Sequence, residues 1–247
     1  MAVRDIYRGW QGEGILHLGV ENSRVLILLA LTFVTGSVDA TSYLGLGRVF
    51  TANMTGNVAL LGFAASGSPG LPLLRSAVAL AAFVAGAVIA GRAVRRADSR
   101  AIWPLPVTAA TGAAALLLTL VFLTWVGHRA ATQPDLVAAT LAFAMGAQGA
   151  ATRKLGVADL PTTVVTSTLT GLAADSALAG GSSVRWRRRA AALVALMSGA
   201  LIGALLVQVT PALGLAPAIV VLGTVTALTA TARLHEPVPL MDVAPAT

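Results

Sequence analysis

Six stretches of predominantly apolar residues, each close to 20 residues long, recur along this chain of 247 residues. A helix needs about 20 such residues to cross the hydrocarbon of a bilayer. The expected spans are Val25–Gly45, Leu73–Ala93, Leu105–Val126, Leu136–Arg153, Ala190–Val209 and Ala212–Ala232. The composition agrees, because 11% charged residues is less than half of the roughly 25% that a soluble domain carries. The sequence therefore predicts an all-α integral membrane protein.

Two shorter segments, Asn53–Ala65 and Thr162–Ala179, are apolar but too short or too rich in hydroxyl groups to be ordinary spans. The distribution of Lys and Arg predicts whether they cross, because cytoplasmic loops carry the excess. If both segments cross, ten basic residues lie inside and seven outside. If both enter and return on the same side, the split is fourteen inside and three outside. We therefore expect six transmembrane helices plus two short re-entrant half-helices, with the N- and C-termini in the cytoplasm.

The chain also repeats itself weakly at a spacing of about 110 residues. The matching segments are Leu31–Gly36 with Leu141–Gly146, Thr51–Val58 with Thr162–Leu169, and Gly86–Ile89 with Gly199–Ile202. Each half then holds three spans, an odd number, so the second half should sit upside down relative to the first. This is the inverted 3+3 repeat of many transporters, whose sites lie where helices are interrupted.

The expected organisation follows from these ranges. Residues 1–24 form a cytoplasmic N-terminal extension, 25–127 the first membrane repeat, 134–232 the second membrane repeat, and 233–247 a C-terminal tail.

Asp39 is an acidic residue well inside the first expected span. A charge at the bilayer centre costs about 2.5–3.5 kcal/mol on insertion scales, so Asp39 should face a partner or a wet cavity. The functional interpretation is a site for a cation, a proton or a polar solute. The alternatives are a fixed ion pair with Arg48 or a cap for a broken helix.

Asn53, Thr55 and Asn57 are expected at the start of the first half-helix. A helix N-terminus presents free N–H groups and a partial positive charge, so it could hold an anionic or carbonyl group of a substrate. The alternative is that these Asn and Thr side chains cap the helix and bond to neighbouring helices.

The second half carries a comparable polar set. Its candidate ligands are Gln148, Thr163, Thr166 and Thr168. Gln148 falls almost opposite Asp39 in the repeat, so we expect both near the pseudo-two-fold axis. The hydroxyl groups could line a polar path, although Thr also bonds back to its own helix.

Three further features concern structure more than chemistry. Asp175 is expected to be a second intramembrane acid, and Arg185, beyond its helix, is one candidate partner. Trp103 and Trp125 bracket the third span about 33 Å apart, as an interfacial aromatic belt requires. The segment Gly199–Gly203 is a small-xxx-small motif, which predicts close helix packing.

Several classes of function are disfavoured. The chain has no Cys, and its three histidines lie far apart and outside the apolar spans. We therefore expect no metal, no cofactor and no enzyme, since an enzyme needs a nucleophile–base pair or a metal set. The basic residues lie between apolar segments, which argues against nucleic acid as a partner. The clusters Arg92–Arg100 and Arg185–Arg189 are expected to contact anionic lipids.

Three groups of residues resemble a known family. They are Val38-Asp39-Ala40, Val49–Asn57, and Met145–Gln148 with Thr162–Thr166. These segments are similar to those of the YoaK-like family of bacterial membrane proteins, and the resemblance covers roughly residues 25–232. Ser167 stands where that family usually has Gly. The family is largely uncharacterised and is often described as small-molecule transporters, so the resemblance implies a membrane fold and names no substrate.

Together these observations predict a transporter or channel-like carrier for a small polar solute, with or without coupling to an ion or proton, in a bacterial inner membrane. The expected ligands are Asp39, Asn53, Thr55, Asn57, Gln148, Thr163, Thr166 and Thr168. The alternative is a membrane scaffold or assembly protein that transports nothing. The oligomeric state stays open, with a homo-oligomer among the options.

Overall fold

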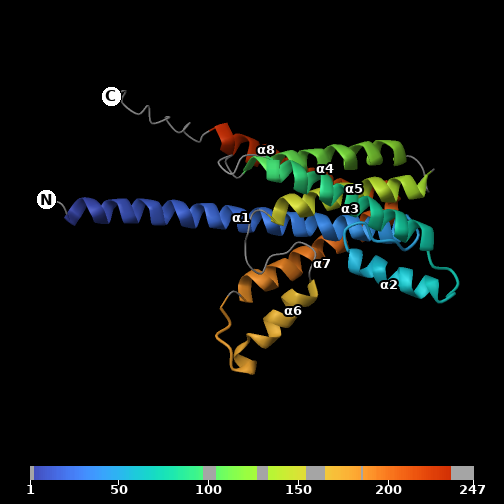
Figure 1. Ribbon diagram of the computed structural model, residues 1–247, viewed down its shortest axis with the longest axis horizontal. Coiled ribbons are helices and arrows are strands. Elements are labelled where there is room, and N and C mark those ends of the chain that lie inside the picture. Colours follow the sequence, from blue (N-terminus) through green and yellow to red (C-terminus); the bar gives the residue numbers. More distant parts are fainter. Residues whose placement is uncertain (1–2, 97–103, 127–132, 154–164, 185, 235–247) are drawn as a thin grey trace.

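The computed structural model describes residues 3–96, 104–126, 133–153, 165–184 and 186–234. All regular elements in these ranges are helices, as predicted, and most run side by side in one bundle (Figure 1). In chain order they are α1 (Val3–Gly45), α2 (Met54–Ala65), α3 (Leu73–Arg96), α4 (Pro104–Trp125), α5 (Pro134–Thr152), α6 (Val165–Ala174), the short 3-10 helix η2 (Ala177–Ala179), α7 (Trp186–Val209), the 3-10 helix η3 (Pro211–Leu215) and α8 (Ala216–Leu234).

Five segments of the described chain are long and apolar enough to cross a membrane. They are Asn22–Gly45, Leu73–Arg95, Val107–Trp125, Trp186–Val209 and Pro211–Thr231. The other expected span corresponds to α5, which has Pro134 and Asp135 in its first turn and Gln148 near its end. These residues lower its hydropathy. The count of six spans therefore remains a prediction, whereas a multi-span helical protein is what the structure describes.

Helix α1 runs without interruption from Val3 to Gly45. At 1.5 Å per residue, its 43 residues extend about 65 Å, roughly twice the thickness of the bilayer hydrocarbon. Its N-terminal part reaches beyond the other helices in Figure 1. The helix has no break between residues 24 and 25, where the sequence suggested that a separate extension ends. The C-terminal tail from residue 235 lies outside the described residues.

Helices α1 and α7 cross through a pair of glycines. A Cβ atom on Gly36 of α1 would lie 2.2 Å from the carbonyl oxygen of Leu196, and one on Gly199 of α7 would lie 2.0 Å from that of Phe33. Ordinary van der Waals contact begins at 3.4 Å. Only glycine therefore lets the two backbones approach so closely, and the packing role predicted for Gly199 is confirmed.

Helices α3 and α5 cross in the same way. A Cβ on Gly86 would lie 2.1 Å from the carbonyl oxygen of Phe143, and one on Gly146 would lie 2.1 Å from that of Phe83. In both crossings each glycine faces a carbonyl group that lies three residues before the partner glycine. Two pairs of helices, α1 with α7 and α3 with α5, are thus joined by the same backbone contact.

The expectation of a lipid-facing belt is wrong for Trp125. Its side chain is only 1% exposed and belongs to the main apolar core. A Cβ on Gly45 would lie 2.9 Å from the Trp125 ring and 3.3 Å from Pro211, so the ring packs where α1 and α7 end. A tryptophan of an aromatic belt would face lipid headgroups instead. Trp103 lies outside the described residues.

The two short helices pack on different long helices, α2 on α3 and α6 on α7. They lie toward opposite ends of the bundle, and α6 leans away from it (Figure 1). Helix α2 begins within one residue of the predicted start. Helix α6 is described from Val165 and ends at Ala174, so the segment expected to continue to Ala179 breaks and resumes as η2.

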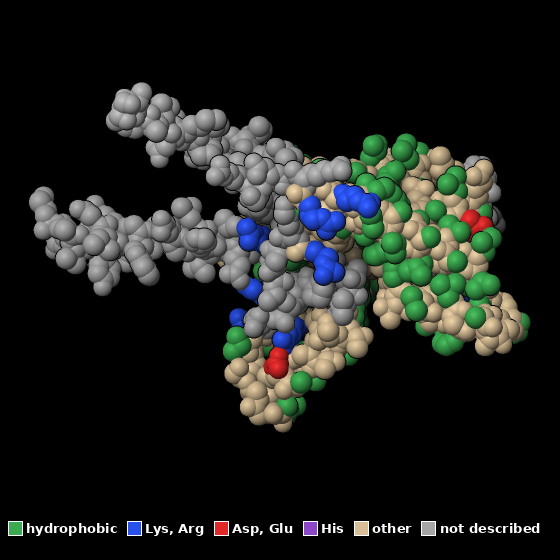
Figure 2. Space-filling view, viewed as in Figure 1, with side chains coloured by type: hydrophobic (Ala, Val, Ile, Leu, Met, Phe, Trp, Pro, Cys, Tyr) green, Lys and Arg blue, Asp and Glu red, His purple; other side chains and the backbone are tan. Residues whose placement is uncertain are grey.

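Arginine gathers at one end of the bundle. Figure 1 places the C-terminal ends of α3 and α5 and the N-terminal end of α7 at the end where α1 enters the bundle. The arginines there whose side chains are described are Arg24, within α1, and, at the helix ends, Arg92, Arg95, Arg153, Arg187, Arg188 and Arg189. Figure 2 shows most of the Lys and Arg side chains visible on that face grouped there. Two other arginines belong to the opposite end of the bundle. Arg48 follows the end of α1, and Arg75 lies in the first turn of α3.

Candidate functional site

The carboxylate of Asp39 caps helix α2 from a neighbouring helix. One of its oxygens, Oδ1, accepts three backbone hydrogen bonds, from the N–H groups of Thr51 (3.1 Å), Ala52 (2.8 Å) and Asn53 (3.3 Å). Asn53 is the N-cap residue of α2, and its N–H is one of the donors that a helix N-terminus leaves without intrahelical partners. Thr51 and Ala52 belong to the non-helical segment just before it. The negative charge also lies where the helix dipole favours it. Among the alternatives that the sequence left open for Asp39, the contacts of its carboxylate match the cap for a broken helix.

This cap fixes how far α2 reaches into the bundle. Asp39 precedes the end of α1 by six residues, which is about 9 Å along the helix. The chain leaves α1 at Gly45, returns by that distance through residues 46–53, and starts α2 beside Asp39. Gly47 and Arg48 adopt left-handed backbone angles, with φ of 80° and 65°, and so allow the sharp reversal.

Asn57 fastens the returning segment to α2. Its Oδ1 accepts the N–H of Phe50 at 3.0 Å, and its Nδ2 donates to the Phe50 carbonyl at 2.6 Å. The side chain is completely buried, so both ends of its amide are engaged. Phe50 also stacks on Tyr43 with ring centroids 4.8 Å apart. Asn57, predicted as a ligand, therefore holds the backbone in place.

Four polar groups at or beside the start of α2 make no hydrogen bond to the backbone in the described ranges. Asn53 occupies the N-cap position without a side-chain capping bond and is half-buried. Thr55 is exposed in the first turn. The hydroxyl of Thr51 is fully buried without a hydrogen-bond partner in the described chain. Within the same ranges, the second carboxylate oxygen of Asp39 accepts no hydrogen bond.

The alternative pairing of Asp39 with Arg48 does not occur in the described ranges, where Arg48 is exposed. The arginine that organises this end is Arg75, at the start of α3. Its Nε donates to Asp135 of α5 at 2.6 Å, and its Nη1 donates to the carbonyl of Leu46. One guanidinium thus ties the segment that follows α1 to α3 and α5.

The second predicted set lies elsewhere. Gln148 is four residues from the end of α5, which runs opposite to α1 in Figure 1. It therefore lies toward the arginine-bearing end, whereas Asp39 lies toward the other. Gln148 is 1% exposed, and its Oε1 has no partner in the described structure. The expectation that Asp39 and Gln148 both lie near the pseudo-two-fold axis stays a prediction.

The hydroxyl groups predicted as a polar path belong to α6. Thr166 is exposed, Thr168 is buried at 6%, and Thr163 lies outside the described residues. Helix α6 packs on α7, whereas α2 packs on α3, and the N-terminal ends of the two short helices point toward each other in Figure 1. That the two sets line one path stays a prediction.

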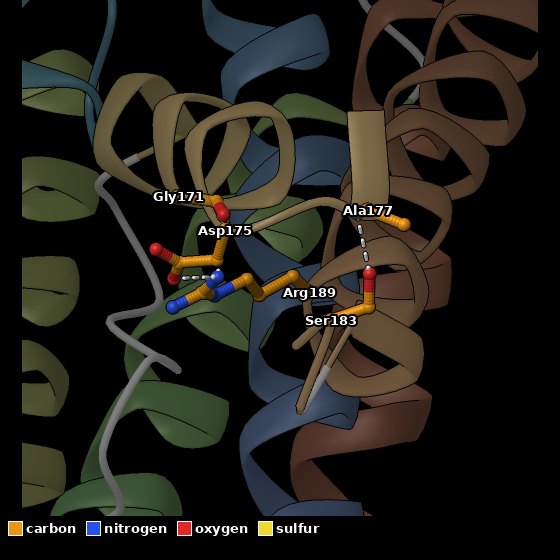
Figure 3. A network of polar contacts seen from close by, with 5 residues as sticks. All are labelled: Gly171, Asp175, Ala177, Ser183 and Arg189. Carbon is orange, nitrogen blue, oxygen red and sulfur yellow. Dashed lines mark hydrogen bonds and ion pairs between the residues drawn. The ribbon is translucent and has the colours of Figure 1, made fainter. Parts of the chain in front are cut away.

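A compact polar network holds α6 to α7 (Figure 3). Arg189 Nη1 donates to the Asp175 carboxylate at 2.6 Å and to the Gly171 carbonyl at 2.5 Å. A Cβ on Gly171 would lie 2.9 Å from the guanidinium carbon, so glycine leaves room for it. The partner suggested from sequence, Arg185, lies outside the described residues; the partner found is Arg189.

The polar groups at the start of α2 are hydrogen-bond acceptors and hydroxyl groups, and they suit an anion poorly. The backbone N–H groups of residues 51–53 already donate to Asp39, whose negative charge disfavours an anion beside them. Within the described ranges, no group of three or more His, Cys, Asp or Glu side chains could hold a metal ion. Sequence reasoning missed Phe50 and Arg75, and the offset of seven residues from Phe50 to Asn57 gave no recognisable signal.

The long apolar helices and the buried polar start of α2 define the class as a multi-pass membrane protein. The chain belongs to the family described as "Protein of unknown function (DUF1275)", whose model matches residues 27–228. It is similar to the UPF0700 transmembrane protein YoaK of Bacillus subtilis (strain 168), with 40% identity over 151 residues. That match covers 61% of this chain and 65% of the relative, slightly less than two thirds of its length. No solved structure matches. The resemblance to the YoaK-like family is thereby confirmed.

Proposed function

We propose that this protein is a carrier for a small polar solute in a bacterial inner membrane. The observation that carries the proposal is the start of α2 and the non-helical segment before it, which Asp39 and Asn57 hold inside the bundle. Non-helical backbone at membrane depth is tolerated only when protein buries it or when it lines a wet cavity. Such interrupted helices form the binding sites of many secondary transporters.

The contacts at α2 narrow the class of solute. Asp39 supplies the negative charge at the helix N-terminus, so an anion would be repelled there. The groups that remain are the second Asp39 oxygen, the Thr51 hydroxyl and the Asn53 amide. These groups suit a neutral or cationic solute that donates hydrogen bonds, such as a polyol or an amine. A proton or monovalent cation at Asp39 would be the coupling ion.

The matched crossings support an inverted repeat. The contact of Gly36 with α7 corresponds to that of Gly146 with α3, at the 110-residue spacing of the sequence repeat. Each half then contributes one interrupted segment, and α2 and α6 lie toward opposite ends of the bundle. A carrier built in this way could open alternately to the two sides. We accordingly propose six spans with two re-entrant helices.

The arginine distribution supports an orientation. The arginine-bearing end would face the cytoplasm by the positive-inside rule, which places α2 toward the outer surface and α6 toward the inner one. Both termini would then be cytoplasmic.

The test combines ligand-induced stabilisation with transport. Purified protein would be melted with a panel of polyols, amines and alkali cations, because a ligand that binds the folded state raises its melting temperature. Asn53→Ala should keep the unliganded melting temperature and lose the shift, since its side chain makes no capping bond. Thr140→Ala is the control, because its hydroxyl bonds to a carbonyl of its own helix. A panel without hits, or hits unaffected by Asn53→Ala, would argue against the site.

Flux distinguishes the second candidate, a non-transporting scaffold. Asp39 and Asn57 both bond to the protein's own backbone, which a scaffold would also require. In proteoliposomes a carrier should move a stabilising solute, and Asp39→Asn should reduce that movement. A scaffold predicts no movement for any hit, with Asp39→Asn changing only stability or assembly. An intramembrane enzyme is the least favoured class.

A further inference from the structure

The turn between α6 and α7 presents large apolar side chains away from the protein. Leu178 of η2 is fully exposed, at 101% of its reference area, while Val184 is 65% and Trp186 is 51% exposed. The three residues lie in the part of the fold that projects sideways from the arginine-bearing end (Figure 1). We call Leu178, Val184 and Trp186 the apolar tip.

The apolar tip is held by a closed loop. The N–H of Ser183 donates to the Asp175 carbonyl at 2.9 Å, and the Ser183 hydroxyl accepts the N–H of Ala177 at 3.0 Å (Figure 3). A Cβ on Gly181 would lie 2.3 Å from the same Asp175 carbonyl oxygen. These contacts and the Arg189–Asp175 ion pair fix the backbone of the turn. The fold itself therefore holds the apolar tip exposed.

Charge accompanies these apolar groups. The guanidinium of Arg187 lies over the Trp186 ring, 5.7 Å from its centroid, and Arg187 is itself exposed. A tryptophan beside an arginine suits the boundary between lipid tails and phosphate groups, where the ring stays amphipathic and the cation meets an anion. The corresponding connection before α3 also leads to exposed apolar residues, Leu73 at 50% and Leu74 at 67%, but residues 66–72 themselves include no exposed large apolar side chain.

We propose that the apolar tip is an interfacial anchor that inserts among anionic phospholipids, with Leu178 and Val184 below the headgroups and Arg187 at the phosphates. The anchor would hold α6 against one leaflet, and it is independent of whether the protein transports a solute.

Depth measurements by spin labelling test the anchor, and the chain has no native Cys to interfere. Leu178→Cys is the probe and Ser68→Cys, exposed in the opposite turn, is the matched control. Both would be labelled in the full-length protein in phosphatidylglycerol or phosphatidylcholine vesicles. We expect the label at 178 to collide more with oxygen than with an aqueous nickel chelate, and the label at 68 to show the reverse. Equal aqueous access at both positions would overturn the anchor.

The headgroup contact has its own readout. Adding Arg187→Gln to Leu178→Cys should make the label shallower in phosphatidylglycerol and leave it unchanged in phosphatidylcholine. A label equally deep in both lipids, with or without Arg187, would overturn the contact with anionic lipid. If Leu178→Cys lowers the melting temperature, Val184→Cys at the same tip replaces it.

Discussion

The glycine crossings offer the sharpest test of the fold. In Gly146→Ala the new methyl group would lie 2.1 Å from the Phe83 carbonyl oxygen, against the 3.4 Å of ordinary contact. The helices α3 and α5 would therefore have to separate locally by about 1.3 Å. Because a carbonyl oxygen on a helix cannot rotate aside, overpacking of this kind should cost about 1–3 kcal/mol.

The same helix supplies the control. Gly149 faces open space, with nothing within 4 Å of the position that a new methyl group would take, so Gly149→Ala should be neutral or gain up to about 1 kcal/mol from helix propensity. At roughly 2–4 °C per kcal/mol, Gly146→Ala should melt roughly 2–12 °C below wild type in detergent or nanodiscs. Gly36→Ala should behave alike, since its methyl would lie 2.2 Å from the Leu196 oxygen. Equal melting temperatures for Gly146→Ala and Gly149→Ala would refute the close crossing.

Three further outcomes are expected. Asn57→Ala should destabilise the protein by about 1–3 kcal/mol because it leaves the Phe50 N–H and carbonyl without their Asn57 partners, whereas exposed Thr55→Ala should stay near wild type in the same melts. Arg189→Ala should increase hydrogen exchange across residues 165–183 with little change in α2, and unchanged exchange there would contradict its role as a tether. Arg75→Ala should lower the melting temperature more than Arg48→Ala, whose side chain is exposed.

The broken helices were predictable because their chemistry is local. The polar and glycine-rich stretch before Asn53 and the brevity of the apolar run after it placed α2 within one residue. The partner of Asp39 was not predictable, because an acid inside a span is compatible with an ion pair, a cap or a ligand. The sequence does not show that the backbone of residues 51–53 folds back to Asp39.

The aromatic-belt prediction failed because the sequence does not distinguish a surface that faces lipid from one that faces protein. Trp125 stands at the end of a span, as a belt residue would, but the neighbouring Gly45 admits its ring into the core.

The interleaved crossings constrain how the protein can be synthesised. Gly36 of α1 rests on Leu196 of α7, which leaves the ribosome roughly 160 residues later. At about 5–20 residues per second, α1 would wait on the order of 10–30 s in the membrane with its glycine face uncovered. Assembly of the bundle should therefore be largely post-translational, and a nascent chain arrested before α7 should be a ready substrate for membrane quality-control proteases.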